Sequence, residues 1–364
     1  MDIAKFVEFR GPEEPVRMEE VEIPALKTGE ILVKNEYTTL CRSDLNTFSG
    51  KRTEKTPTIL GHEIVGRIAA FGPETKQADS RKQSLNIDDR ITWAIYASDP
   101  DAELSREGIP QKAPDLFKYG HERITPESNL HGGLSEYTVL RANTPVAKLD
   151  EDVPLKLASI INCAVATSAG ALRLAGELKG KNVLISGAGM LGITACAMCK
   201  IGGAHFVAAL DLNPRRLETA REFGADAVFS SVQEMEREIP GSDLPSGFHA
   251  ALDFSGVAPV MEETLKNLTI GGTAVWVGAT HPQRNLQLNA EKVIRNLWTI
   301  KGLHNYNEED FVTAVHFIEN HHGDFPFELL VHDKFTLEKA NEAFDYALKE
   351  NPYRAGIRIN HINK

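Results

Sequence analysis

Cysteine is scarce in this chain, which has four among its 364 residues: Cys41, Cys163, Cys196 and Cys199. Four cysteines are too few for a disulfide framework at this length, so we expect a reducing, cytoplasmic setting. An excess of positive charge is also absent, because the formal net charge is −11. This acidic balance argues against nucleic-acid partners and against binding to anionic membranes.

Long apolar runs are lacking as well. The start of the chain, MDIAKFVEFR, carries charge and has no apolar segment of the kind found in signal peptides. The longest low-charge run, residues 158–176, is rich in small and polar residues and contains Arg173. We therefore expect a helix packed inside the protein and no membrane span.

The composition of the whole chain, 42% hydrophobic and 25% charged, is that of a globular protein. Its length predicts two domains. Short alternating segments in residues 1–150 predict a mostly antiparallel β domain. The predicted strands are AKFVEF (4–9), EILVKNEYTT (30–39), EIVGRIAAFG (63–72), RITWAIYA (90–97) and LSEYTVL (134–140). A polar segment with three prolines, residues 98–120, interrupts them as a loop.

From about residue 156 strands and helices alternate, which predicts a parallel sheet with helices on both faces. The predicted strands are NVLIS (182–186), HFVAALD (205–211), HAALDFSG (249–256) and TAVWVGA (273–279), and the predicted helices include PRRLETAREFG (214–224) and TLKNL (264–268). The part after about residue 300 returns to mixed elements. The sequence thus predicts an α/β protein, with a β-rich domain over 1–156 and 299–364 and a doubly wound domain over 157–298.

The motif GAGMLG, residues 187–192, has the spacing G-x-G-x-x-G, follows a predicted strand and opens a helix. In such a motif Gly187 permits the tight turn, Gly189 lets the backbone approach a pyrophosphate, and Gly192 packs the helix on the strand. The pyrophosphate is expected at the helix N-terminus, where free N–H groups favour an anion.

Asp211 follows Gly192 by nineteen residues, at the end of the next predicted strand. We expect it to bond the adenosine ribose and to repel a 2′-phosphate, so that NAD is preferred over NADP. Arg216 either stacks on the adenine or neutralises a 2′-phosphate. The other expected cofactor contacts are Met190, Leu191, Val277 and Gly278.

The sequence LGHEIVG, residues 60–66, places His62 beside Glu63 in an apolar stretch, where unpaired polar groups are costly to bury. A metal would account for the pair, because a catalytic zinc takes three protein ligands and keeps one position open. The other candidate ligands are Cys41 and Cys163. Because Cys163 lies near the start of the second predicted domain, we expect the site in the cleft between the two domains.

These motifs resemble the medium-chain, zinc-dependent alcohol dehydrogenases along essentially the whole chain. The resemblance rests on CRSD (41–44), GHE (61–63), the C-x-x-x-T of residues 163–167, GAGMLG (187–192) and the following Asp211. It implies a GroES-like catalytic domain for the β-rich part and a Rossmann domain for the doubly wound part. It also implies a catalytic zinc on Cys41, His62 and Cys163.

The same resemblance assigns roles to neighbouring residues. Glu63 would be a transient ligand or lie just outside the ligand set, and Asp44 would orient the imidazole of His62. Ser43 would pass on the proton of the substrate hydroxyl, and Thr167 would lie against the nicotinamide. The implied reaction transfers a hydride between NAD(H) and an alcohol or carbonyl substrate.

Two features depart from the family. Its structural zinc needs four cysteines in the pattern C-x-x-C-x-x-C-x7-C, and this chain has Asp99, Ala102, Ser105 and Ala113 there, so we expect a single, catalytic zinc. That segment would be mobile or be held by packing of Ile109, Leu116, Phe117 and Tyr119. Asn46 stands where several relatives have a histidine that completes a proton path, and asparagine does not titrate near neutral pH.

A narrower resemblance, to phosphonate-catabolism-associated alcohol dehydrogenases and nearby cyclitol-modifying enzymes, rests on ILGHEIVG, KYGHE (118–122), GAGMLG and GLHNY (302–306). It implies a cyclitol, a polyol, or an alcohol that carries a phosphonate or phosphate. Lys51 and Arg52 either contact such an anion or form a solvated basic pair.

Two other functions fit parts of the pattern. An NAD(P)H-dependent reductase of an activated C=C bond, in an enone, a quinone or a cyclitol enone, would keep the fold and change the reaction. A non-catalytic nucleotide-binding protein would keep only the fold, and the complete set of candidate zinc ligands argues against it. We expect a homodimer or homotetramer, because the apolar strand at 273–279 lies near the sheet edge and suits pairing across a two-fold axis.

Overall fold

The computed structural model describes residues 2–12, 14–239 and 244–359, which form two compact units. Unit 1 consists of Met1–Cys163, Asn307–Gly323 and Phe327–Lys364, and unit 2 consists of Ala164–Tyr306 and Asp324–Pro326. Residues 157–163 belong to unit 1, whereas the sequence predicts that the second domain begins at 157. The last five residues of the predicted range 299–364 lie outside the described residues.

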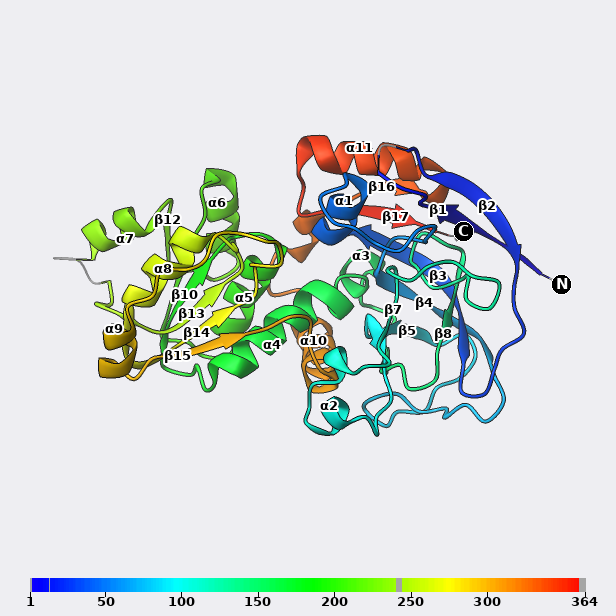
Figure 1. The fold of residues 1–364 in the computed structure, drawn as a ribbon, viewed down its shortest axis with the longest axis horizontal. Helices are drawn as coiled ribbons and strands as arrows, with labels where there is room; N and C mark the ends of the chain where they lie inside the picture. Colours follow the sequence, from blue (N-terminus) through cyan, green and yellow to red (C-terminus); the bar gives the residue numbers. More distant parts are fainter. Residues whose placement is uncertain (1, 13, 240–243, 360–364) are drawn as a thin grey trace. The chain divides into compact units, whose positions relative to one another are not determined.

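Unit 1 is built around a seven-stranded sheet with the order β16-β17-β3-β4-β5-β9, and β8 also pairs with β3 (Figure 1). Its strands are β1 (Ile3–Glu8), β2 (Arg17–Glu22), β3 (Ile31–Leu40), β4 (Glu63–Phe71), β5 (Arg90–Trp93), β6 (Tyr96–Ala97), β7 (Phe117–Lys118), β8 (Tyr137–Leu140), β9 (Val146–Lys148), β16 (Val331–Thr336) and β17 (Arg354–Arg358). Its α-helices are α1 (Arg42–Phe48), α2 (Glu103–Arg106), α3 (Leu155–Ala158), α10 (Glu308–His321) and α11 (Ala340–Glu350).

The pairings of the described strands in unit 1 are antiparallel, except that β16 and β17 run parallel. The mostly antiparallel β domain expected from the sequence is thus confirmed. The prediction of one strand over 90–97 is wrong, because the chain changes partners in the middle: β5 pairs with β4 and β9, while β6 pairs with β7. Continuous apolar character concealed this change of partner.

Unit 2 contains a six-stranded parallel sheet with the order β12-β11-β10-β13-β14-β15. Its strands are β10 (Asn182–Ser186), β11 (Phe206–Leu210), β12 (Ala227–Phe229), β13 (Phe248–Asp253), β14 (Leu268–Trp276) and β15 (Thr299–Gly302). Its α-helices are α4 (Ala166–Ala175), α5 (Met190–Ile201), α6 (Pro214–Glu222), α7 (Val232–Glu238), α8 (Ala258–Lys266) and α9 (Ala290–Arg295). If the six strands are numbered along the chain, their order in the sheet is 3-2-1-4-5-6, which is that of a doubly wound sheet. The order in which strands are added reverses between β10 and β13.

Two details of unit 2 correct the sequence analysis. The predicted helix at 264–268 ends at Lys266, and Leu268 already begins β14. The predicted edge strand at 273–279 corresponds to β14, which has β13 on one side and β15 on the other. Because both edges of β14 are already paired, it cannot pair across a two-fold axis, and β15 forms that edge of the sheet.

The low-charge run around residues 158–176 lies within the helical segment Leu155–Ala175. In the described part of the chain, this segment alone is long and apolar enough to cross a membrane by length and composition. However, 78% of the window that passes this test is buried inside the protein, as is common for core helices. This burial agrees with the packed helix expected from the sequence.

The polar segment at 98–120 contains little regular structure and is anchored by aromatic rings. Phe117 and Tyr119 are buried, with ring centroids 5.2 Å apart in an edge-to-face arrangement. Ile109 was expected to join this packing, but it is 39% exposed, so that expectation is wrong. The apolar anchor of the segment therefore lies at its end.

His131 is a buried titratable residue in unit 1. Its ring centroid lies 6.1 Å from that of Phe117, and within the described residues neither ring nitrogen has a hydrogen-bond partner. Burial lowers the pKa of His131 to about 4, and the nearby charges of Arg141 and His121 act in the same direction. The folded protein thus holds this imidazole neutral at neutral pH.

We expect unit 1 to lose stability as the pH falls from about 6.5 toward 4, because the unfolded chain protonates His131 with a pKa of about 6.5 while the folded chain resists it. The difference between the two pKa values corresponds to at most about 3–4 kcal/mol of unfolding free energy. Urea-unfolding midpoints between pH 7.5 and 4.5 measure the loss, and His131→Leu should show a shallower dependence. Equal slopes for the two proteins would contradict this account.

Candidate active site

Three segments of unit 1 bring the candidate metal ligands together. Cys41 stands at the N-cap of α1, directly after β3, while His62 and Glu63 stand at the start of β4. Cys163 lies in a π-helical turn, Ile161–Val165. One ligand atom from each of these four residues lies within 4.8 Å of the other three. Unit 1 therefore supplies the whole group, whereas the sequence analysis assigned Cys163 to the second domain.

The group is closed on most sides. Cys41, His62 and Glu63 are buried, and Cys163 is half-buried. Cys163 is thus the most exposed member of the cluster. This suits a catalytic metal site, which must leave one coordination position open to substrate or water.

Asp44, in the first turn of α1, fixes the orientation of His62. One carboxylate oxygen accepts from the Cys41 N–H at 2.8 Å; the other accepts from the Gly61 N–H at 3.2 Å and lies 3.2 Å from His62 Nδ1. With Nδ1–H donating to Asp44, Nε2 is the ring nitrogen left to bind a metal. Asp44, acting against burial, raises the pKa of His62 well above its ordinary value.

Ser43 and Asn46 lie on the same helix as Asp44. Ser43 Oγ is 3.5 Å from His62 Nε2, which puts the hydroxyl beside the atom expected to bind metal. Asn46 follows Ser43 by three residues and so lies on the same side of α1. Its main-chain carbonyl accepts from the Arg52 N–H at 3.0 Å.

Glu63 is engaged by an arginine that the sequence analysis missed. Arg354, on β17, donates from Nε and Nη2 to the two carboxylate oxygens at 2.6 and 2.7 Å. Thr39 Oγ1 donates to the same carboxylate at 2.5 Å, and Arg354 Nη2 lies 3.6 Å from Cys41 Sγ. An arginine at the start of the strand-like segment YRAGIRI was the sequence signal that could have found it.

The position of β17 is tightly constrained near Arg354. The strand runs between β3 and β16, and its Gly356 faces the side chain of Tyr37. A Cβ atom at 356 would lie 1.8 Å from the Tyr37 hydroxyl oxygen, far inside contact distance. Tyr37 is itself fully buried, so this part of the strand has no spare room.

A hydrogen bond between the Cys41 and Cys163 thiols shifts their pKa values in opposite directions. The hydrogen bond from Cys163, helped by Arg354 and His62, holds the pKa of Cys41 well below its ordinary value. The same hydrogen bond, together with burial, raises the pKa of Cys163. A cation bound here would replace the proton of this hydrogen bond, because metal binding by cysteine releases protons.

These observations test whether the residues fit a zinc ion. Two cysteine sulfurs and one imidazole nitrogen are donors that zinc prefers, and Asp44 holds the imidazole with Nε2 toward them. Cys41, His62 and Cys163 therefore fit a zinc ion as its three protein ligands. Glu63 lies beside them with its charge balanced by Arg354.

Further charged residues border His62. The His121 ring centroid lies 5.0 Å from that of His62, and His121 Nδ1 is 3.0 Å from Glu54 Oε1. Glu54 also pairs with Arg52, at 2.6 Å. A chain of contacts thus joins the candidate metal ligand to Arg52, whereas the neighbouring Lys51 is exposed.

Lys118, on β7, adds another positive charge to this surrounding. Burial, followed by repulsion from Lys112 and Arg52, lowers the pKa of Lys118 to about 8. Attraction to Glu54 acts in the opposite direction. Arg52 and Lys118 are thus two cations near Glu54, which His121 links to His62, in a chain with a net charge of −11.

Unit 2 contains the predicted nucleotide loop between β10 and α5. Gly187 has a φ of +90°, which glycine adopts without strain, and Gly189 is the N-cap of α5. A Cβ atom at Gly192 would lie 1.9 Å from the Gly187 carbonyl oxygen, so no side chain fits there. Gly187 and Gly192 thus occupy positions that require glycine, while the role of Gly189 stays a prediction.

The residues around the loop tie it to the sheet. One oxygen of Asp211 accepts from the Ala188 N–H and the other from the Asn213 N–H, both at 2.8 Å. Each carboxylate oxygen of Asp211 has further acceptor capacity for a ribose hydroxyl.

The other predicted cofactor contacts lie on several elements of unit 2. Met190 and Leu191 are in the first turn of α5, Thr167 is on α4, and Arg216 is on α6 with its guanidinium near Gly189. The N–H groups of Val277 and Gly278 both donate to the Asp253 carbonyl.

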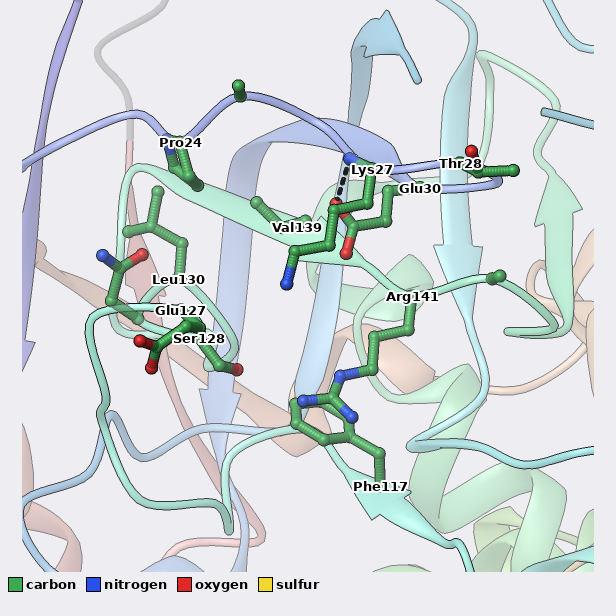
Figure 2. A pocket seen from close by; sticks show the side chains of 13 residues that line it. Pro24, Lys27, Thr28, Glu30, Phe117, Glu127, Ser128, Leu130, Val139 and Arg141 are labelled. Atoms are coloured by element: carbon green, nitrogen blue, oxygen red, sulfur yellow. Dashed lines mark hydrogen bonds between the residues drawn. The ribbon is translucent and has the colours of Figure 1, made fainter. Parts of the chain in front are cut away.

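A surface cavity of about 390 Å³ lies elsewhere in unit 1. Figure 2 shows the side chains of Lys27 and Arg141 extending into it, with the Arg141 guanidinium 3.7 Å from the centroid of the Phe117 ring. None of the four clustered residues lines this cavity. The candidate active site therefore rests on the side-chain cluster.

Two family models match the chain. The alcohol dehydrogenase GroES-like domain matches residues 27–151, and the zinc-binding dehydrogenase model matches residues 191–320. The chain belongs to the medium-chain zinc-type alcohol dehydrogenase family. This confirms the predicted fold class, a GroES-like catalytic domain with a Rossmann-like parallel-sheet domain, while the narrower branch stays a prediction.

Individual relatives match over nearly the full length. L-threonine 3-dehydrogenase of Yersinia pestis (strain Pestoides F) is 27% identical over 341 residues, 92% of this chain and 93% of the relative. An alcohol dehydrogenase structure from Thermotoga maritima is 25% identical, with a TM-score of 0.92 over 99% of this chain and all of that one. Benzyl alcohol dehydrogenase from Acinetobacter calcoaceticus shares the fold, with 23% identity and a TM-score of 0.84 over 99% of this chain and all of the other.

Proposed function

We propose that this protein is a zinc-dependent dehydrogenase that interconverts an alcohol and its carbonyl product with NAD(H). The observation that carries the proposal is the buried group of Cys41, His62 and Cys163, with Asp44 holding the imidazole in place. Unit 1 would serve as the catalytic domain and unit 2 as the cofactor domain. The substrate is a small molecule.

When bound, zinc supplies a Lewis acid for an alcohol oxygen, and nicotinamide supplies the hydride chemistry. Ser43, 3.5 Å from His62 Nε2, is placed to accept a hydrogen bond from a substrate hydroxyl and to carry its proton away. Arg354 offsets the negative charge of Glu63 and of the Cys41 sulfur, and Glu63 stays available as a transient ligand. Asn46 lies on the same side of α1 as Ser43 and would hydrogen-bond along the outward proton path.

We further propose that the cofactor is NAD. Asp211 places a carboxylate at the end of β11, beside the glycine loop, where it would accept from ribose hydroxyls and repel a 2′-phosphate. Arg216, near Gly189, would then stack on the adenine. Thr167, Val277 and Gly278 would lie along the nicotinamide half of the cofactor.

Zinc content tests the proposed function directly. We expect about one zinc per chain, in the open three-ligand site, by elemental mass spectrometry of freshly purified protein. Cys41→Ala should lose both the zinc and the alcohol-dependent reduction of NAD. Cys196→Ala, which removes a buried cysteine of unit 2, is the matched control and should keep both.

Other results would redirect the proposal. Absence of zinc from a protein that still binds nicotinamide would favour reduction of an activated C=C bond. About two zinc ions per chain would mean that the segment at 98–120 binds metal through ligands other than cysteine. Faster turnover with NADP than with NAD would contradict the role given to Asp211.

We propose that the alcohol carries an anionic group, such as a phosphate or phosphonate, and that Lys118 and Arg52 recognise it. The support is the contact of Arg52 with Glu54, which His121 links to the His62 ring, and the electrostatic influence of both groups on Lys118 in an acidic protein. A charge-assisted hydrogen bond contributes about 1.5–3 kcal/mol, which corresponds to roughly tenfold to a hundredfold in binding.

Paired substrates test this assignment. Lys118→Met should raise the KM for a phosphate-bearing alcohol about tenfold or more and leave the KM of the neutral alcohol of equal chain length unchanged. Lys51→Met, at the exposed neighbour of Arg52, is the control and should affect neither substrate. Equal losses on both alcohols would show that Lys118 does not read the charge of the substrate.

We propose that the protein forms a homodimer, or a homotetramer built from two such dimers, through the β15 edge of the unit 2 sheet. Exposed apolar side chains near this edge support the proposal, with Ile294 72% and Leu297 70% exposed. Light scattering after size exclusion should give at least twice the monomer mass, and Ile294→Glu should reduce it. Leu329→Glu, at an equally exposed position in unit 1, should leave the measured mass unchanged. A wild-type protein that is monomeric at micromolar concentration would refute the proposal.

A further inference from the structure

Asn162 is a buried polar residue next to a candidate metal ligand. It immediately precedes Cys163 in the π-helical turn Ile161–Val165, and its side chain is fully buried. Single π-helical turns inserted in α-helical segments are uncommon and often occur at functional sites. The turn redirects the backbone where Cys163 must face the cluster.

The side-chain amide of Asn162 connects this turn to two strands. Its Nδ2 donates to the His62 carbonyl at 3.0 Å and to the Trp93 carbonyl at 2.8 Å. The His62 carbonyl directly precedes β4, and Trp93 is the last residue of β5. One amide group therefore holds the residue before Cys163 against the main chain of His62, across 100 positions of sequence.

This connection has a chemical consequence for the cluster. Asp44 fixes the rotation of the His62 ring, but nothing in that contact sets how far the ring lies from the Cys163 sulfur. The Asn162 side chain, by contrast, joins the residue before Cys163 to the main chain of His62. A metal site needs its ligands held to within about 0.5 Å, so a contact that sets this spacing tunes metal affinity.

We propose that Asn162 is a positioning residue that sets the spacing of Cys163 and His62 and thereby the affinity for zinc. The proposal rests on the proposed function, because it assumes that these residues bind zinc. It goes beyond it by assigning a role to a residue that neither the motif nor the ligand set contains. A purely structural asparagine would stabilise unit 1 without changing how the metal is held.

Asn35 provides a matched control for that distinction. It is also fully buried in unit 1, and its Nδ2 donates twice, to the Ser135 carbonyl at 2.7 Å and to Thr138 Oγ1 at 2.9 Å. Its partners lie on and just before β8, and none of them is a cluster residue. Loss of either amide should therefore have similar effects on stability and different effects on the metal.

The experiment compares Asn162→Ala and Asn35→Ala by chelator competition for zinc and by the visible absorption of the cobalt-substituted proteins. We expect Asn162→Ala to weaken zinc binding about tenfold to a hundredfold and to alter the cobalt spectrum. Asn35→Ala should leave both unchanged while lowering the urea midpoint to a similar degree. Asn162→Ser, whose hydroxyl can still reach one carbonyl, should lie between the wild type and Asn162→Ala, and it replaces the alanine variant if that does not fold.

Wild-type zinc affinity and cobalt spectrum in the Asn162 variants would overturn the proposal and leave the proposed function standing. The same loss in Asn35→Ala would also overturn it, because the effect would then follow from stability alone. A wild-type protein that binds no zinc would overturn the proposed function and this inference with it.

Discussion

The buried ion pair between Glu63 and Arg354 is the constraint on which the site depends. Arg354 is 4% exposed and Glu63 fully buried, and charges so placed are tolerated only when they are paired and hydrogen-bonded. Removal of one partner from such a pair costs about 3–5 kcal/mol, because the other charge is left buried. The pair therefore links β17 across β3 to β4, whose first residue is Glu63, and Cys41 directly follows β3. Through Arg354 it also sets the charge around Cys41.

Much of the fold was predictable because its information is local. The strand at 182–186, the helix it feeds and the glycine loop between them follow from neighbouring residues, and the structure contains all three. The failures are of another kind. Nothing in RITWAIYA marks the residue at which one strand ends and another with different partners begins. The position of β14 inside the sheet depended on β15, a short strand that no local pattern distinguished.

The candidate site divides in the same way. Cys41, His62 and Cys163 were predicted because their motifs resemble a known family, and the structure brings their ligand atoms together. Arg354 was missed because it lies 291 positions from Glu63, and such pairings come only from the assembled sheet. The assignment of Cys163 to the second domain failed because the division between the units falls inside a helical segment, with no break in composition to reveal it. The spacing set by Asn162 is likewise a property of the folded backbone.

The close approach of Gly356 to the Tyr37 hydroxyl means that substitutions at positions 37 and 356 depend on each other. Any side chain at 356 would enter space that the tyrosine fills, and the strand cannot move aside without drawing Arg354 off Glu63. A larger residue at one position therefore demands a much smaller one at the other, so neither can be changed first without loss. In a directed-evolution experiment that accepts one substitution at a time, both positions would stay unchanged even though neither is among the clustered residues. Mutant libraries that seek activity on new substrates should therefore randomise other positions, or randomise positions 37 and 356 together.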